Sequence, residues 1–367
     1  MKHKIADLPL HYGEAPKWLF ERQKKLLFEI CKVIILEFST EELLNRLSDP
    51  VWFQILGCIS GFDWHSSGVT TTVTAAIKEM FNNHPEYGIY IFGGKGKTAI
   101  NTPKEILSCK QISHPENFII LSKLTAKVDN SCIQDGYKIY HHTIFVDKNN
   151  NWCVIQQGMN TNLKYARRYH WFNKITKSES QKFIVSPHRG IATQKKENSI
   201  LNFVDENSDK FQNNILEYIN LQKPESIINE IKKISYSLKF QPDLFLPQRH
   251  YILTEDFDFK KLYKMFTKIK DTELNSFKDL LLIEGVGTKT LRALGLISEL
   301  IYGYPVSTKD PARFSFAFGG KDGHPYPVDR ENYDKTLSLF KYIVDKSKLE
   351  GKEKLKVLKT LSIFFDS

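Results

Sequence analysis

Two apolar segments joined by a short polar turn dominate the middle of this sequence. Residues 138–147 read KIYHHTIFVD and residues 152–160 read WCVIQQGMN, with KNNN between them. Short runs rich in β-branched and aromatic residues on either side of a polar turn predict a β-hairpin. Both faces of these strands are largely apolar, which is typical of a sheet covered by helices on both sides.

The length of the turn determines which residues of the hairpin lie opposite each other. If Asp147 pairs with Trp152, then His142 faces Gln157 and His141 faces Gly158. Side chains alternate along a strand, so we expect the two histidines on opposite faces of the sheet. Polar groups gathered at one end of an apolar hairpin are typical of a site, because buried polar groups need partners. The pattern predicts that one histidine serves this site, and the pairing favours His142.

Helical and strand patterns alternate in the first half of the chain. This alternation predicts an α/β or α+β domain with a mixed sheet over residues 1–190. Residues 191–214 are rich in Asn, Lys and Glu, and we expect them to form a polar linker. Nearly every later segment has helical periodicity, so residues 215–367 are predicted to form an all-helical domain.

One helical segment contains a turn with a clear chemical meaning. Residues 280–303 read LLLIEGVGTKTLRALGLISELIYG, so two helices meet at a Gly-Val-Gly turn. Glycine permits a tight turn, and the helix that follows presents free N–H groups suited to a phosphate. The stretch resembles the helix-hairpin-helix motif of DNA repair proteins, which implies contacts to the DNA backbone. The residues expected to make them are Gly285, Gly287, Thr288, Lys289 and Thr290.

The charge of the chain also favours a polyanionic partner. It has 52 Lys and Arg against 42 Asp and Glu, a formal net charge of +10, and basic chains commonly bind nucleic acid. The stretch GGKGKT at 93–98 lacks the glycine spacing of a Walker A loop, but Lys95 and Lys97 could still help to bind a phosphate. Arg167 and Arg168 in YARRYHW are further candidates for DNA binding.

Acidic and imidazole side chains cluster in two stretches near the hairpin. GFDWHSSGVT supplies Asp63 and His65, and AKVDNSCIQDGY supplies Lys127, Asp129 and Asp135. Carboxylates suit Mg²⁺ or Mn²⁺, so this composition predicts a divalent metal held by the three aspartates. The full set of candidate catalytic residues is His142, His141, His65, Asp63, Lys127, Asp135, Gln157 and Asn160.

The hairpin is also similar to the phospholipase D superfamily pattern. In that pattern a His and an Asp share one strand and a Gly-x-x-Asn type of loop ends the next; His141, Asp147, Gly158 and Asn160 match these positions approximately. The similarity implies a histidine that attacks phosphorus. The family's lysine is replaced here by Thr143.

Taken whole, the chain resembles a family known as domain of unknown function 763, found in archaea and bacteria. The stretches that carry the resemblance include LSDPVWFQILGCISGFDWHSSGVTTTVTAAIKE, GIYIFGGKGKT and AKVDNSCIQDGYKIYHHTIFVD. They fall within residues 1–190, and the helical part follows. The resemblance implies only that the two parts belong together.

These features favour a DNA-processing hydrolase, most simply a nuclease whose first domain cuts phosphodiester bonds while the helical domain holds the duplex. One alternative is a helix-hairpin-helix DNA glycosylase that uses Asp329, which follows Val328 as in such enzymes. Another is a non-catalytic DNA-binding scaffold, in which the polar hairpin is a structural network.

The expected partner is therefore nucleic acid, most simply DNA, and a homodimer is compatible with the sequence. No apolar run has the ~18 residues of a membrane span, so no membrane partner is expected. The five scattered cysteines contain no Cys-x-x-Cys pair and suit a reducing cytoplasm.

Overall fold

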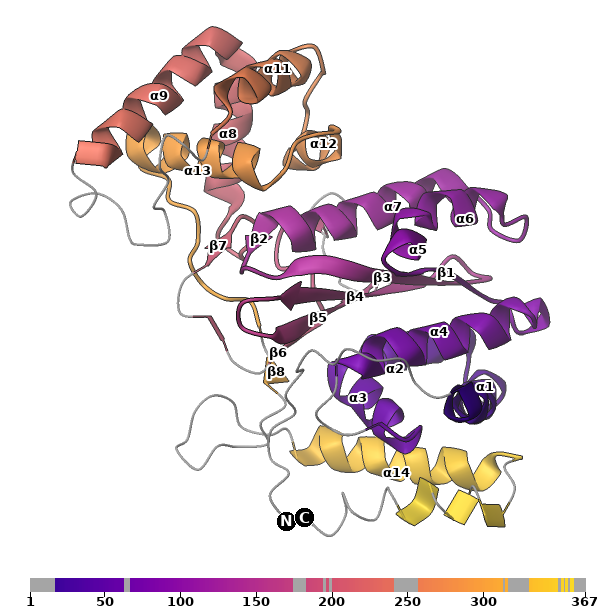
Figure 1. The fold of residues 1–367 in the computed structure, drawn as a ribbon. Helices are drawn as coiled ribbons and strands as arrows, with labels where there is room; N and C mark the ends of the chain where they lie inside the picture. Colours follow the sequence, from indigo (N-terminus) through magenta and orange to yellow (C-terminus); the bar gives the residue numbers. More distant parts are fainter. Residues whose placement is uncertain are drawn as a thin grey trace.

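The fold consists of a central sheet between two helical layers, with a further lobe of helices stacked on one of them (Figure 1). The computed structural model describes residues 17–62, 67–173, 183–193, 196–197, 200–240, 257–312, 314–315, 330–348, 351–352, 354–355 and 357–359. None of the helices in these ranges combines the length and the apolar character that crossing a bilayer requires.

The central sheet has six strands in the order β1-β3-β4-β5-β6-β8. Their bounds are β1 Ile89–Lys95, β3 Lys138–Asp147, β4 Trp152–Asn160, β5 Tyr165–Phe172, β6 Gly190–Thr193 and β8 Phe314–Ser315. Neighbouring strands are antiparallel except for β6 and β8, which are parallel. A separate antiparallel pair joins β2 (Ile133–Gln134) to β7 (Leu201–Asn202). The structure confirms the predicted mixed α/β class.

Helices cover both faces of the sheet, as the apolar strands predict (Figure 1). One layer contains α1 (Lys17–Glu37), α2 (Thr40–Leu47), α3 (Pro50–Ile59) and α4 (Gly68–Asn82). The other contains α5 (Lys97–Ile100), α6 (Thr102–Ser108), α7 (Pro115–Lys127) and the π-helical turn η2 (Val128–Cys132); a 3₁₀ turn, η1 (Pro85–Tyr87), precedes β1. Strand residues alternate between the layers: Phe145 joins the core under α1–α4, whereas Ile144 and Val146 join the core under α7.

The β3–β4 hairpin forms where it was predicted, but its register differs by one residue. Val146, rather than Asp147, lies opposite Trp152. Asp147 instead bonds to the turn: its N–H donates to Asn151 O (2.9 Å) and its carbonyl accepts from Asn150 N (3.0 Å). Asn150 has a left-handed conformation, with φ 65°, which asparagine tolerates. The strands therefore pair one residue out of step with the register assumed from the sequence.

This shift changes the partners of both histidines. His141 lies opposite Gln157, and His142 lies opposite Gln156, so the predicted pairs of His142 with Gln157 and His141 with Gly158 are wrong. The expectation that the two histidines point to opposite faces holds: His141 contacts Thr74 of α4, whereas His142 contacts Ser122 of α7.

Residues 191–214 contribute to the core instead of forming a polar linker. They include most of β6, all of β7 and the start of α8 (Asp209–Leu221). Ile191, Phe203 and Phe211 are buried within them. Several polar residues of the segment are buried as well, among them Asn202, Asp205 and Gln212, so its polar composition does not indicate exposure.

The predicted all-helical part divides between two places. Helices α8, α9 (Pro224–Phe240), α11 (Phe259–Lys270), α12 (Phe277–Leu282) and α13 (Thr288–Tyr302) form the lobe above α7 (Figure 1). The chain then returns to the sheet as β8, and α14 (Arg330–Lys346) packs at the opposite end of the molecule from the lobe. Phe340 of α14 stacks on Trp52 of α3, with ring centroids 4.9 Å apart.

The outer edge of β1 is covered by side chains from helices. Asn82 bonds both groups of one peptide: its Nδ2 donates to Ile91 O (2.9 Å), and its Oδ1 accepts from Ile91 N (3.1 Å). At Gly93 the N–H donates to Glu105 Oε2 (2.8 Å), and the carbonyl accepts from Lys78 Nζ (2.7 Å). These four bonds replace the strand that an open sheet edge would otherwise recruit.

We predict that Asn82→Ala lowers the free energy of unfolding by about 1 kcal/mol, because the Ile91 peptide loses both hydrogen-bond partners. The variant should also promote self-association through the uncovered edge of β1. Urea denaturation and analytical ultracentrifugation measure the two effects. Asn83→Ala is the matched control, since Asn83 is the next residue and exposed. Equal stability and mass for the two variants would show that the Asn82 amide does not protect the edge.

Candidate nucleic-acid interface

The turn between α12 and α13 has the backbone that its glycines predicted. Gly285 has φ +97°, a conformation that favours glycine. A Cβ atom there would lie 2.2 Å from Met265 Cε, the flexible end of a side chain of α11. Val286 is 1% exposed and lies between the helices. Gly287 has an extended backbone and immediately precedes α13.

Side chains of the α7–η2–β2 region hold this turn in place. Lys127, at the end of α7, donates to Val286 O. Gln134 Nε2 donates to Thr288 O (3.1 Å), and Gln134 Oε1 accepts from Arg292 Nε (3.1 Å). Burial lowers the pKa of Lys127. Lys127 was predicted to be catalytic, but its contacts give it the role of an anchor for the turn.

The outer side of the turn is suited to an anion. No side chain in the described part of the chain caps the N-terminus of α13, so its first N–H groups have no partner of that kind. Lys289 is exposed beside them, whereas Thr290 is buried. Helix α11 adds five lysines and no acidic residue. Lys268 Nζ lies 3.0 Å from Glu284 O in the turn and 3.7 Å from the exposed Glu284 carboxylate. The sequence predicts a helix in this segment, but its lysines were not among the residues expected to bind DNA.

On the α4 side of the sheet, the predicted site residues His141 and Gln157 belong to a buried hydrogen-bond network, in which His141 Nδ1 has no hydrogen-bond partner. His141 is 1% exposed, and its Nε2 lies 3.0 Å from Thr74 Oγ1 and 2.9 Å from Thr143 Oγ1. Gln157 is fully buried; its Nε2 donates to Ser67 O (3.0 Å) and to Tyr140 Oη, and its Oε1 accepts from Thr70. Burial lowers the pKa of His141 to about 3, so the ring is neutral at physiological pH.

On the α7 side, a second network connects the sheet to η2. His142 Nε2 lies 2.9 Å from Ser122 Oγ, and its Nδ1 lies 2.9 Å from Gln156 Oε1. Gln156 and Trp171 both donate to Asp129 Oδ2, and His188 bonds its other oxygen. Asp129 is fully buried, and its oxygens are occupied by protein donors. Burial also lowers the pKa of His142.

Arg167 and Arg168 are completely buried, so they do not belong to a DNA-binding surface as predicted. Arg167 donates to Asp135 (2.8 Å) and to both oxygens of Asp310 (2.8 and 3.2 Å). Arg168 donates to Gln54 Oε1 (2.8 Å) and, through Nε, to His170 Nε2 (2.9 Å). Burial lowers the pKa of Arg168 to about 9.

Asp135, a predicted metal ligand and catalytic residue, is part of this ion-pair cluster. Besides Arg167, it accepts from Tyr169 Oη (2.7 Å) and from Tyr137 N (3.0 Å). Burial raises the pKa of Asp135, and the Arg167 charge opposes that shift. Removing one partner from such a buried pair typically costs ~3–5 kcal/mol, so the cluster has a structural role that joins β5 to the residues before β8.

The remaining predicted site residues are scattered. Asn160 Oδ1 accepts from Asn162 N and Leu163 N (3.1 and 3.0 Å) and so closes the turn after β4. Lys95 and Lys97 are exposed where β1 leads into α5. Asp147 of the phospholipase D pattern caps its own turn through Asn149 N and Asn151 N (2.9 and 2.8 Å). Three candidates lie outside the described residues: Asp63, His65 and Asp329.

The described residues do not fit a bound Mg²⁺ or Mn²⁺. They contain no group of three or more His, Cys, Asp or Glu side chains arranged to hold a metal. Asp129 and Asp135 point into separate networks, and protein donors satisfy both.

The geometry therefore defines a mixed α/β protein with a docked helical lobe that presents a glycine turn. Residues 4–328 match the family described as "Protein of unknown function (DUF763)", and the chain belongs to that family. No curated protein and no solved structure shows significant similarity to it.

We predict that the neutral, buried His141 makes stability depend on pH. The folded pKa is about 3 and the unfolded value is ~6.5, so only the unfolded state binds the proton between them. Stability from this residue is complete above pH ~6.5 and declines as the pH falls, by ~1.4 kcal/mol per unit. His141→Gln should remove that part of the slope in urea denaturation at pH 4–7.

The reference for this slope is the wild-type protein, measured in the same urea series over the same pH range. A wild-type slope retained in His141→Gln would contradict the buried neutral state.

Proposed function

We propose that this protein binds DNA through the sugar–phosphate backbone, with the α12–α13 hairpin as its principal contact and the α/β domain as the scaffold that positions it. The observation that carries the proposal is the turn itself. Gly285 has the required positive φ, Val286 is buried as a plug, and Gly287 leaves the N-terminus of α13 open. Such a contact reads the backbone and not the base sequence.

The charges around the turn support a polyanion as the ligand. The five lysines of α11 lie on the helix that packs against Gly285, and Lys289 is exposed in the first turn of α13. A protein that neutralises phosphates in this way loses affinity steeply as salt rises, because counterions are released on binding.

A nuclease remains the second proposal, but most of the residues first assigned to it serve other purposes. His141, His142, Asp129 and Asp135 are buried and hydrogen-bonded within the protein. A group that attacks or protonates a phosphodiester must reach it, so cleavage would depend on Asp63 and His65, which lie outside the described residues.

We predict that Gly287→Glu weakens duplex binding at least ~10-fold, because the new carboxylate repels the phosphate and a charge-assisted hydrogen bond contributes ~1.5–3 kcal/mol. The variant should fold, since a Cβ atom at this position meets only Gly285 O, at 3.9 Å. Fluorescence anisotropy with duplexes of several sequences measures the decrease in affinity, which should be similar for all of them. The salt slope should also decrease by about 1 for each phosphate that the variant no longer neutralises.

Gly351→Glu is the matched control. It makes the same change of charge where a Cβ atom meets nothing within 4 Å, in the segment that follows α14 (Arg330–Lys346) and outside the α12–α13 hairpin. Equal weakening by both variants would mean that only net charge matters, and the hairpin assignment would then be wrong.

The scaffold and nuclease proposals differ in what happens to bound DNA. With labelled single-stranded and duplex DNA, in Mn²⁺ and in EDTA, we expect binding without strand breaks and without alkali-labile sites. Metal-dependent breaks that disappear in Asp63→Ala would establish the nuclease instead. Breaks that appear only after alkali and disappear in Asp329→Asn would establish the glycosylase.

A further inference from the structure

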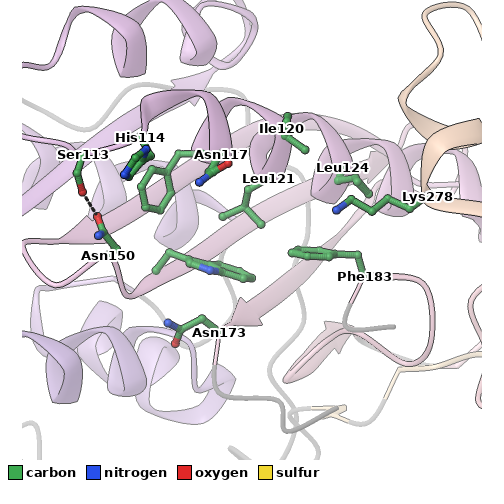
Figure 2. Close-up of a pocket in the computed structure, with 12 residues that line it drawn as sticks. Ser113, His114, Asn117, Ile120, Leu121, Leu124, Asn150, Asn173, Phe183 and Lys278 are labelled. Atoms are coloured by element: carbon green, nitrogen blue, oxygen red, sulfur yellow. Dashed lines mark hydrogen bonds between the residues drawn. The ribbon is translucent and has the colours of Figure 1, made fainter. Parts of the chain in front are cut away.

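A second surface beside the α12–α13 hairpin has the features of a binding site. A groove of about 490 Å³ lies between α7 and the β3–β4 turn, on the same face of the sheet as the helical lobe. Figure 2 shows Ile120, Leu121 and Leu124 of α7 along one wall, with the ring of Phe183 opposite. Trp152 also lines the groove. None of these side chains takes part in the contacts of the α12–α13 turn described above.

The two aromatic rings of the groove form a stacked apolar pair. Trp152 and Phe183 lie in nearly parallel planes, 15° apart, with centroids separated by 6.0 Å. Both are only partly buried. Ile120 on α7 is 40% exposed across the groove. A planar aromatic ligand can therefore lie on the rings with apolar side chains against its other side, as bases do on aromatic platforms.

The polar side chains of the groove suit a nucleotide in particular. Lys278 extends from α12, its Nζ 5.7 Å from the Phe183 ring centroid, and it supplies a cation for a phosphate. Asn117 and Asn150 supply amide groups that can pair with the edges of a base. The described lining contains no Asp or Glu, which disfavours a cationic ligand.

The groove and the glycine turn are built on the same two helices. Lys278 belongs to α12, the first helix of the hairpin, and α7 ends at Lys127, which bonds Val286 O in the turn. The groove and the turn are therefore connected through α7 and α12.

We propose that this groove receives an unpaired nucleotide of the DNA strand held at the hairpin. The base stacks on Trp152 and Phe183, and its phosphate pairs with Lys278. The proposal rests on DNA binding by the α12–α13 turn, and it adds a preference for junctions between duplex and single strand.

The test compares a blunt duplex with the same duplex carrying a single-stranded extension, 5′ or 3′, that contains the fluorescent base 2-aminopurine. We expect the wild-type protein to bind one extended form about 5- to 150-fold more tightly than the blunt form, the range that base–aromatic stacking contributes, and to change the 2-aminopurine emission. Phe183→Leu and Lys278→Gln should each reduce this ratio while blunt-duplex affinity is kept, and Phe183→Tyr should retain it.

Gly287→Glu distinguishes the two proposals, because it should weaken binding to both DNAs and leave their ratio unchanged. If blunt duplex binds but the extension adds no affinity and no change in emission, the groove assignment is wrong and the hairpin proposal stands. The groove assignment is also wrong if Phe183→Leu and Lys278→Gln, with wild-type melting temperatures, keep the full ratio. If neither DNA binds, the proposed function fails and the groove proposal fails with it.

Discussion

Both faces of the sheet are covered by helices, so the buried polar side chains of β3, β4 and β5 depend on hydrogen-bond partners inside the protein. Three buried nitrogens on these strands lack one: His141 Nδ1, Arg167 Nε and His170 Nδ1. Because successive side chains of a strand point to opposite faces, each residue can reach partners in only one of the two helical layers. His141 and Gln157 bond to α4, whereas His142 and Gln156 bond to α7 and η2. A slip of one residue would move each of them to the wrong layer and would leave it unpaired. The polar residues of the hairpin thus specify its register.

The α7-side network also determines where the helical lobe sits. His142 holds α7 through Ser122, and Gln156 holds η2 through Asp129. Lys127 lies between Ser122 and Asp129 in the chain, and it bonds Val286 O in the α12–α13 turn. A short series of hydrogen bonds therefore runs from the centre of the sheet to the surface proposed to contact DNA. The turn is presented in a fixed orientation, as recognition of a rigid duplex backbone requires.

Local patterns in the sequence predicted the local features well. The hairpin, the opposite orientation of His141 and His142, and the glycine turn all follow from residues that are adjacent in the chain. The pairing register of the β3–β4 hairpin could not be predicted in this way, because the turn sequence KNNN does not reveal which of its residues adopts the left-handed conformation. The burial of Arg167 was equally hidden: arginine is usually exposed, and its partner Asp310 lies 143 residues away. Helical periodicity likewise indicated the apolar face of α14 without identifying α3 as its partner.

The position of α14 has a consequence for how the chain is made. Trp52 stacks on Phe340, and Tyr342 bonds Glu37 across 305 residues. Phe340, Ile343 and Val344 complete the same core as the helices of the first layer. A ribosome that has synthesised the helices of that layer has therefore exposed an apolar surface that it cannot yet cover. Since chains emerge at ~5–20 residues per second, that surface stays open to chaperones or to other nascent chains for many seconds, until α14 arrives.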